Sequence, residues 1–175
     1  MERMSTVAVS SPLDQLAQPL DYVRVRVATP DDGSGWPPVA SEGLWALDFG
    51  TGRYQIANAP YFADGLALGD VVEATADADG VLWAGERVHP SGHQTLRVLP
   101  PSRGWDAGDI EGAQGFLASL GGGLGVYAEP QHEVIVIDVA PGTDLVKLKA
   151  QLDVGRSNGM WRVVEGSVTP DWHAV

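Results

Sequence analysis

Residues 93–101, HQTLRVLPP, contain the change of pattern that decides the fold. Before this stretch the apolar residues alternate with polar ones, as where Val23, Val25 and Val27 are separated by arginines. Such alternation is typical of a half-buried strand. After the two prolines the spacing becomes three or four residues, which is typical of an amphipathic helix. The first such stripe consists of Ile110, Ala113, Leu117 and Leu120. The sequence therefore predicts an α+β chain with its β-rich half first.

The segment before the switch contains short strands joined by tight turns. Gly50 and Gly52 separate two candidate strands, and Asp79-Gly80 precedes another, a dipeptide that favours β-hairpins. Strands at this regular spacing, with no helical pattern between them, predict a small SH3-like antiparallel β-barrel over residues 21–99.

The segment after the switch contains two helical stripes, the second beginning near Asp144, and three further strands at 124–128, 133–139 and 161–164. Together with strand 93–99 this order predicts a ferredoxin-like βαββαβ half over residues 93–169. The pattern leaves open whether strand 93–99 serves both halves, and we expect the two cores to adjoin. Residues 1–20 are expected to form a flexible leader and residues 170–175 a tail.

Net charge limits the class of partner. The chain has 23 acidic and 11 basic side chains and a formal net charge of −12. Nucleic acids and anionic membranes are bound through cations that neutralise phosphates, so neither is an expected partner. A basic protein partner is favoured electrostatically, although the same charge also serves solubility.

The chain has no cysteine, which excludes disulfides and thiolate chemistry. No secretory signal and no apolar run long enough to span a bilayer is recognised, so we expect a cytoplasmic protein.

Two histidines flank a serine at residues 89–93. His89 and His93 have the spacing of two metal ligands on a helix, but Pro90 and Gly92 exclude a helix there. We therefore expect no metal and no cofactor. A turn in which Ser91 binds nearby backbone is the simpler interpretation. The enzyme alternative places His93, Ser91 and Asp64 in a pocket between the two halves.

Aromatic residues on loops are the other candidates for a site. Trp36, Tyr61 and Phe62 lie on predicted loops, where aromatics either cover a small barrel or contact a partner. We take these three with Asp64 and His93 as candidate binding residues. The remaining acids near the predicted barrel rim, Asp70, Glu73 and Glu86, are interpreted as solvated charges.

Three stretches resemble the bacterial domain-of-unknown-function family 4265. They are residues 36–45, WPPVASEGLW, residues 58–72, NAPYFADGLALGDVV, and residues 91–98, SGHQTLRV. The resemblance extends over about residues 20–168. It implies a small soluble bacterial protein, and it implies no catalytic residue.

The leading functional hypothesis is therefore a non-catalytic, cytoplasmic protein-binding module of the immunity-protein or accessory-factor type. It would bind its partner through an acidic surface and the loop aromatics. The alternatives are the small enzyme described above and a small-molecule sensor, which rests on fold analogy alone. The sequence does not decide between a monomer and a homodimer.

Overall fold

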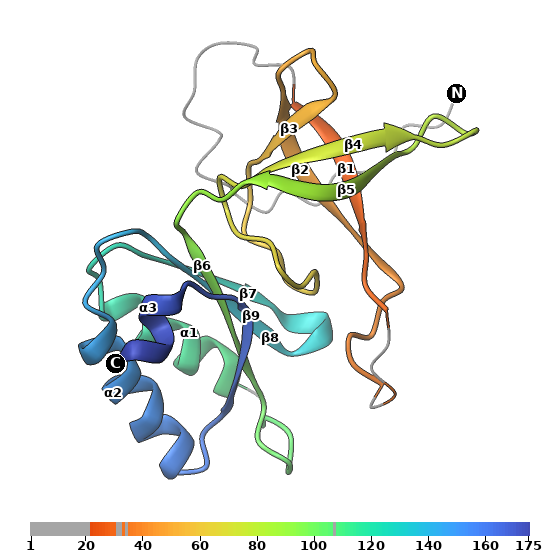
Figure 1. Ribbon diagram of the computed structural model, residues 1–175. Helices are drawn as coiled ribbons and strands as arrows, with labels where there is room; N and C mark the ends of the chain where they lie inside the picture. Colours follow the sequence, from red (N-terminus) through yellow and green to blue (C-terminus); the bar gives the residue numbers. More distant parts are fainter. Residues whose placement is uncertain (1–21, 31–32, 34, 107) are drawn as a thin grey trace.

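The computed structural model describes residues 22–30, 33, 35–106 and 108–175 (Figure 1). It contains two separate, mostly antiparallel sheets and a few helices, which confirms the predicted α+β class. The predicted leader, residues 1–20, lies outside the described residues.

The first sheet closes on itself in the order β1-β2-β3-β4-β5. Neighbours along the chain pair antiparallel, and a short parallel contact between β1 and β5 completes the closure. The strands are β1 (Tyr22–Ala28), β2 (Ser41–Asp48), β3 (Arg53–Ile56), β4 (Val71–Ala76) and β5 (Leu82–His89). Alternation turns one set of side chains inward, and these form the first core. Its buried members are Val25, Leu44, Ala46, Tyr54, Ile56, Leu66 and Val72.

The second sheet has the order β7-β8-β6-β9, and every pair in it is antiparallel. Its strands are β6 (Gln94–Leu99), β7 (Leu124–Glu129), β8 (Val134–Val139) and β9 (Arg162–Ser167). β6, which the sequence left open between the two halves, pairs with β8 on one side and with β9 on the other. The central strands of the second sheet are therefore β8 and β6.

Helices α1 (Asp109–Ser119) and α2 (Leu145–Ser157) cover one face of the second sheet, the face turned away from the barrel in Figure 1. α2 begins as predicted, because the Asp144 carboxylate accepts the Lys147 backbone N–H at 3.0 Å. α1 begins without such a cap. Gly108, at φ 88°, precedes it, and no side chain caps it. A short 3-10 turn, η2 (Pro130–His132), joins β7 to β8.

Residues 170–175, expected as a tail, include the short helix α3 (Pro170–Ala174). Trp172 is only 4% exposed and belongs to the core of the second half. The Lys149 ammonium donates to the Trp172 carbonyl at 2.7 Å and lies over the Trp172 ring. The chain end is thus packed against α2, a contact that apolar periodicity cannot reveal in so short a segment.

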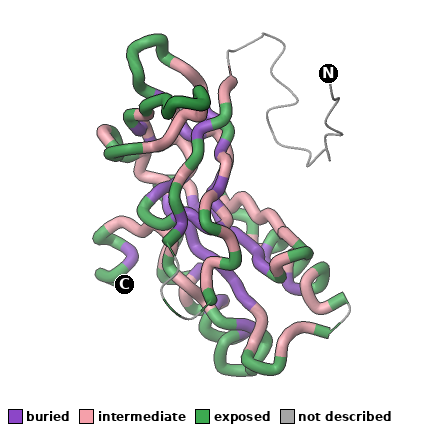
Figure 2. The backbone as a smooth tube through the Cα atoms, turned by 90° about the vertical axis from the view of Figure 1, so that its right-hand side faces the viewer, coloured by how far each residue is buried: buried purple, intermediate pink, exposed green. Residues whose placement is uncertain are grey.

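Residues 57–70, the yellow loop between the two sheets in Figure 1, contain no strand and no helix; we call them the crossing segment. Phe62 of this segment packs with Leu99 and Val134 of the second sheet in a third cluster of buried residues. Figure 2 shows buried residues continuing through the middle of the molecule. The two cores therefore adjoin through the crossing segment.

Candidate functional site

The candidate site is the contact between the crossing segment and the helix-free face of the second sheet, which we call the seam. Thr95 and Arg97 of β6 and Asp138 of β8 lie on this face, and all three are at most 5% exposed. Alternation along β6 and β8 directs their neighbours toward the helices instead. Buried polar groups require partners, so the bonds of these three residues define how the seam is built.

Glu42 of β2 binds the crossing segment from the barrel side. Its carboxylate oxygens accept the backbone N–H groups of Tyr61, Phe62 and Ala63 at 2.8, 2.9 and 2.8 Å. Glu42 is only 9% exposed. Hydrogen bonds from backbone N–H groups to a carboxylate are among the stronger ones in proteins. Glu42 therefore holds a turn of the chain that has no secondary structure of its own.

Arg97 binds the same segment from the opposite side. Its side chain is 0% exposed, and its Nη1 donates to the Asp64 carboxylate at 2.6 Å. Nη2 donates to the Ala63 carbonyl, while the buried Nε has no partner among the described residues. The irregular pairing of β6 with β9 places Gly166 beside the guanidinium. A Cβ at Gly166 would lie 3.0 Å from Arg97 Cζ, so glycine leaves the space that the cation occupies.

Two further bonds close the seam. The Thr95 hydroxyl donates to the Leu66 carbonyl at 3.0 Å, and the Gly65 N–H donates to the Gly166 carbonyl at 2.8 Å. Because Glu42 and Arg97 both bind residues 61–64, the two halves hold one shared segment between them. Their relative position is fixed by directional polar bonds as well as by apolar packing.

His93 pairs with Asp138 at one end of the seam, with 2.8 Å between Nδ1 and the carboxylate. Burial raises the pKa of Asp138, and the hydrogen bond and charge of His93 oppose that shift. Tyr127, on the neighbouring strand β7, has a raised pKa because of its own burial and the nearby charge of Asp138. A carboxylate on one ring nitrogen orients the imidazole, which is a feature of both structural and catalytic histidines.

Asp70 is not the solvated rim charge that the sequence suggested. It is 1% exposed, and its carboxylate accepts the N–H groups of Ala67 and Ser91 at 2.9 and 2.7 Å. Arg87 of β5 donates to it at 3.2 Å. The expectation failed because a carboxylate between glycine and valine in a loop gives no sign that the loop folds over it.

The three residues of the enzyme alternative each have a different partner. The Ser91 hydroxyl donates to the Leu68 carbonyl at 2.7 Å and accepts the backbone N–H of His93 at 3.1 Å. The His93 ring contacts Asp138, and Asp64 contacts Arg97. A serine nucleophile requires the histidine ring within hydrogen-bond reach of its hydroxyl, and the bonds of Ser91 are instead made to backbone.

The predicted loop aromatics gather over the seam. The ring centroids of Trp36 and Phe62 are 5.7 Å apart, and Phe62 meets His132 edge-on at 5.2 Å. Phe62 is 8% exposed, whereas Trp36 and Tyr61 are half-buried. Burial and the charges of nearby carboxylates raise the pKa of Tyr61 to about 12, so its hydroxyl stays protonated. The aromatics thus cover the seam and leave two partly accessible edges.

These contacts occur largely within the part of the chain that matches a known family model. The model named Domain of unknown function (DUF4265) matches residues 42–163. The chain belongs to the DUF4265 family. Glu42, Asp64, Arg97 and Asp138 lie inside the matched range, while Gly166 lies just beyond it.

A solved structure gives a second comparison. A crystal structure described as a novel structure of a hypothetical protein from Neisseria gonorrhoeae is 19% identical to this DUF4265 chain, with a TM-score of 0.64. The similarity covers 83% of this chain and 94% of the other. At that identity it shows the fold alone. No curated protein matches the chain.

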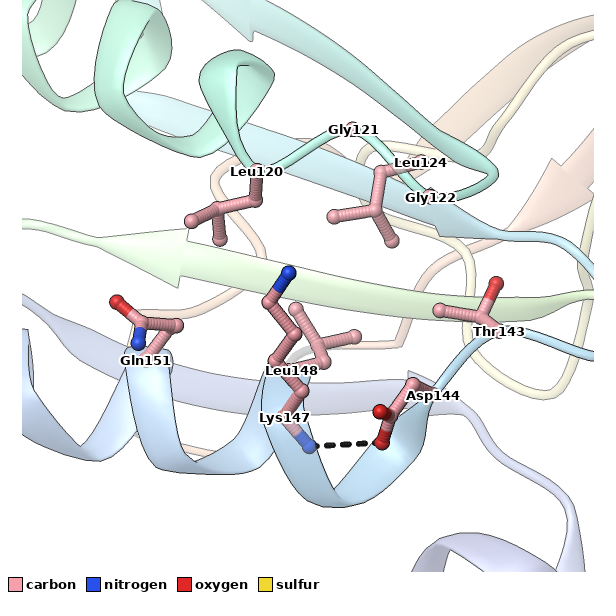
Figure 3. A pocket seen from close by; sticks show the side chains of 9 residues that line it. All are labelled: Leu120, Gly121, Gly122, Leu124, Thr143, Asp144, Lys147, Leu148 and Gln151. Carbon is pink, nitrogen blue, oxygen red and sulfur yellow. Dashed lines mark hydrogen bonds between the residues drawn. The ribbon is translucent and has the colours of Figure 1, made fainter.

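Two cavities lie elsewhere in this DUF4265 chain. One, of about 170 Å³, is shown in Figure 3 between the end of α1 and the start of α2, where Leu120, Leu124 and Leu148 meet the Lys147 side chain. The other, of about 340 Å³, lies between α2, β9 and α3. None of the predicted site residues lines either cavity.

The described residues hold no cluster of three or more metal-ligating side chains. Within the same residues, no helix has both the length and the apolar character needed to cross a membrane.

The structure brings the five predicted binding residues to the seam, but sequence reasoning missed the polar residues that position them. These are Glu42, Thr95, Arg97 and Asp138. The available signal is that Arg97 and Asp138 each stand between two apolar residues of a predicted strand, because an ionisable residue there needs a partner. The identity of that partner depends on the fold.

Proposed function

We propose that this protein is a non-catalytic protein-binding module, of the immunity-protein or accessory-factor type, whose partner is basic. The observation that carries the proposal is Asp64. Its side chain is 78% exposed, although the arginine that holds it is fully buried. A carboxylate presented in one fixed geometry loses little conformational freedom on binding, which favours affinity.

The surroundings of Asp64 support a contact surface. Trp36 and Tyr61 are half-buried, and the rings of both contact Phe62. Tyr61 and Phe62 shortly precede Asp64 in the sequence. Aromatic residues anchored at one edge and accessible at the other are common in binding hot spots. The net charge of −12 adds long-range attraction for a basic partner.

The separate partners of Ser91, His93 and Asp64 support binding over the enzyme alternative. We place the protein in the cytoplasm, supported by its lack of cysteine.

The test uses the full chain as bait in native lysate, washed at rising salt, with captured proteins identified by mass spectrometry. The Asp64→Asn variant is compared with Asp106→Asn, because Asp106 is also an exposed aspartate paired with an arginine, at 3.2 Å from Arg103. We expect one basic protein whose capture falls with salt, falls about tenfold with Asp64→Asn, and is unchanged by Asp106→Asn. Absence of any salt-sensitive basic partner, or equal effects of both variants, contradicts the proposal.

We also infer the finer fold classes: an SH3-like barrel and a ferredoxin-like second half. The strand order β7-β8-β6-β9 with helices on one face supports the second assignment, because it is the split βαβ arrangement. The closure of five strands supports the first. An experimental structure that showed β6 and β7 as direct neighbours would contradict the ferredoxin-like assignment.

A further inference from the structure

The outer wall of the barrel, away from the seam, carries two arginines and two tryptophans. Arg24 and Arg26 point outward from β1, because Val25 between them lies in the barrel core. Trp45 on β2 and Trp83 on β5 point outward for the same reason. We call these four residues the Arg–Trp wall.

The wall is arranged as two neighbouring pairs. Arg24 lies opposite Trp45 in the register of β1 and β2, and its guanidinium is 4.9 Å from the centroid of the Trp45 ring. A Cβ at Gly43 would lie 2.9 Å from Arg24 Nη2, so glycine lets the cation lie flat against the sheet. Arg26 lies opposite Trp83 in the register of β1 and β5.

Neither arginine of the wall has a carboxylate partner among the described residues, although the indole N–H of Trp83 donates to the Asp77 carboxylate at 2.8 Å. Five other arginines of this acidic protein have a carboxylate within ion-pair distance; they are Arg53, Arg87, Arg97, Arg103 and Arg156. Arg24 and Arg26 have none in the described part of the chain, and Arg26 donates to the Ser41 hydroxyl at 2.8 Å. Both arginines are exposed, and Trp45 is 42% exposed.

We propose that the Arg–Trp wall binds an acidic segment of a protein partner. The two guanidinium groups would bind carboxylates of that segment. The Trp45 ring would contact an apolar or aromatic side chain that lies between those carboxylates in the segment. Tryptophan and arginine are the residue types that most often dominate binding energy at protein interfaces. A nucleic acid fits less well, since its affinity depends on neutralising many phosphates and only two cations face it.

This surface goes beyond the proposed function. It recognises the opposite charge from the seam, and none of its four residues takes part in the seam. Loss of binding at one surface therefore leaves the other surface testable by itself.

The test measures binding of a fluorescent peptide, made of glutamates with phenylalanines between them, to the full chain by fluorescence anisotropy at low ionic strength. The double variant Arg24→Gln/Arg26→Gln is compared with Arg53→Gln, which removes an exposed arginine paired with Glu73. We expect the double variant to raise Kd at least about tenfold and Trp45→Ala several-fold, with Arg53→Gln changing it less than about twofold.

Four results overturn the proposal. The first is no binding of the glutamate peptide. The second is equal binding of the same peptide with glutamines in place of its glutamates. The third is tighter binding of a single-stranded thymidine oligonucleotide, abolished by the same double variant. The fourth is self-association of the parent chain that the double variant abolishes, because the wall would then contact a second copy. Thermal unfolding of each variant confirms that the barrel remains folded.

Discussion

The two faces of the second sheet are equally buried but are built differently. On the helix-covered face, Leu96, Val98, Ile135, Ile137 and Val139 are 0% exposed, and all are apolar. On the helix-free face, Thr95, Arg97 and Asp138 are at most 5% exposed and polar, and they lie among buried apolar residues that meet the crossing segment, such as Leu99 and Val134. The first face is covered by helices with satisfied backbones. The second is covered by the crossing segment, whose backbone needs partners from other elements.

The comparison teaches that the cover decides the chemistry of a buried face. The helices cover the sheet below them mainly with apolar side chains, so volume is what must match there. An irregular segment also supplies unpaired N–H and C=O groups, and polar side chains such as Glu42 and Arg97 satisfy several of them. Substitutions on the two faces should therefore fail for different reasons.

The largest effect is expected for Glu42→Ala, which leaves three backbone N–H groups of the crossing segment without acceptors. Hydrogen bonds to a charged group contribute about 1.5–3 kcal/mol each, so we expect the free energy of unfolding to fall by about 5 kcal/mol. Denaturant unfolding measures this loss. The control is Glu73→Ala, an exposed glutamate on a barrel strand whose pairing with Arg53 contributes at most about 1 kcal/mol. If Glu42→Ala lowered the free energy of unfolding no more than Glu73→Ala does, Glu42 would not be needed at the seam.

A smaller effect is expected for Asp64→Ala, which leaves the buried Arg97 guanidinium without its carboxylate. Removing one partner of a buried ion pair lowers the free energy of unfolding by about 3 kcal/mol at the lower end of the usual range. We expect the lower end because the Asp64 side chain is largely exposed. Arg97→Met removes the buried charge itself and should cost less, about 1 kcal/mol. Denaturant unfolding of the two variants in parallel tests this order, and the reverse order would show that Arg97 acts mainly through the Ala63 carbonyl.

The helix-covered face should respond to volume instead. A Cβ at Gly155 of α2 would overlap the Trp161 ring, which is only 2% exposed. Gly155→Ala should therefore destabilise by about 2 kcal/mol despite the better helix propensity of alanine. Gly115→Ala on α1 is the matched control, since no atom lies within 4 Å of its Cβ position. It should stabilise by about 0.5–1 kcal/mol, and differential scanning calorimetry would detect opposite shifts in Tm.

The smallest effect is a pH dependence at Asp138. Because burial raises the pKa of Asp138, the folded protein keeps the proton over a pH interval above about 4, where the unfolded chain has released it. Stability therefore falls as the pH rises through that interval. The His93→Gln variant removes the opposing interaction, so as the pH rises above about 4 its unfolding free energy should fall more steeply than that of the double variant His93→Gln/Asp138→Asn. Parallel slopes for the two variants would show that Asp138 is adequately solvated.

The same contrast between faces explains how much could be predicted from the sequence. The stripe containing Ile110 and Leu117 correctly indicated α1, and alternation in β1 and the turn at Asp79-Gly80 correctly placed barrel strands. Such patterns indicate apolar faces that pack against helices or strands. β6 was found as a strand, although all six of its residues are buried and its pattern does not alternate cleanly.

The polar side of the molecule was harder to predict. The sequence singled out Asp64 and His93 as candidates, but it did not reveal their partners Arg97 and Asp138, which lie on strands of the second sheet. Asp70 was misassigned as solvated because burial of a loop carboxylate depends on which N–H groups fold toward it. α3 is too short for periodicity to identify, and its place depends on Trp172 reaching the core.

The bond between Gly65 and Gly166 has a consequence for biosynthesis. The crossing segment leaves the ribosome long before β9, so the barrel strands can pair while residues 63–66 still lack the acceptors and donors that the second sheet supplies. Contacts so distant along the chain slow folding and leave intermediates with exposed surface. A nascent chain of this protein would therefore hold its crossing segment incompletely bonded until the last strand of the second sheet arrives.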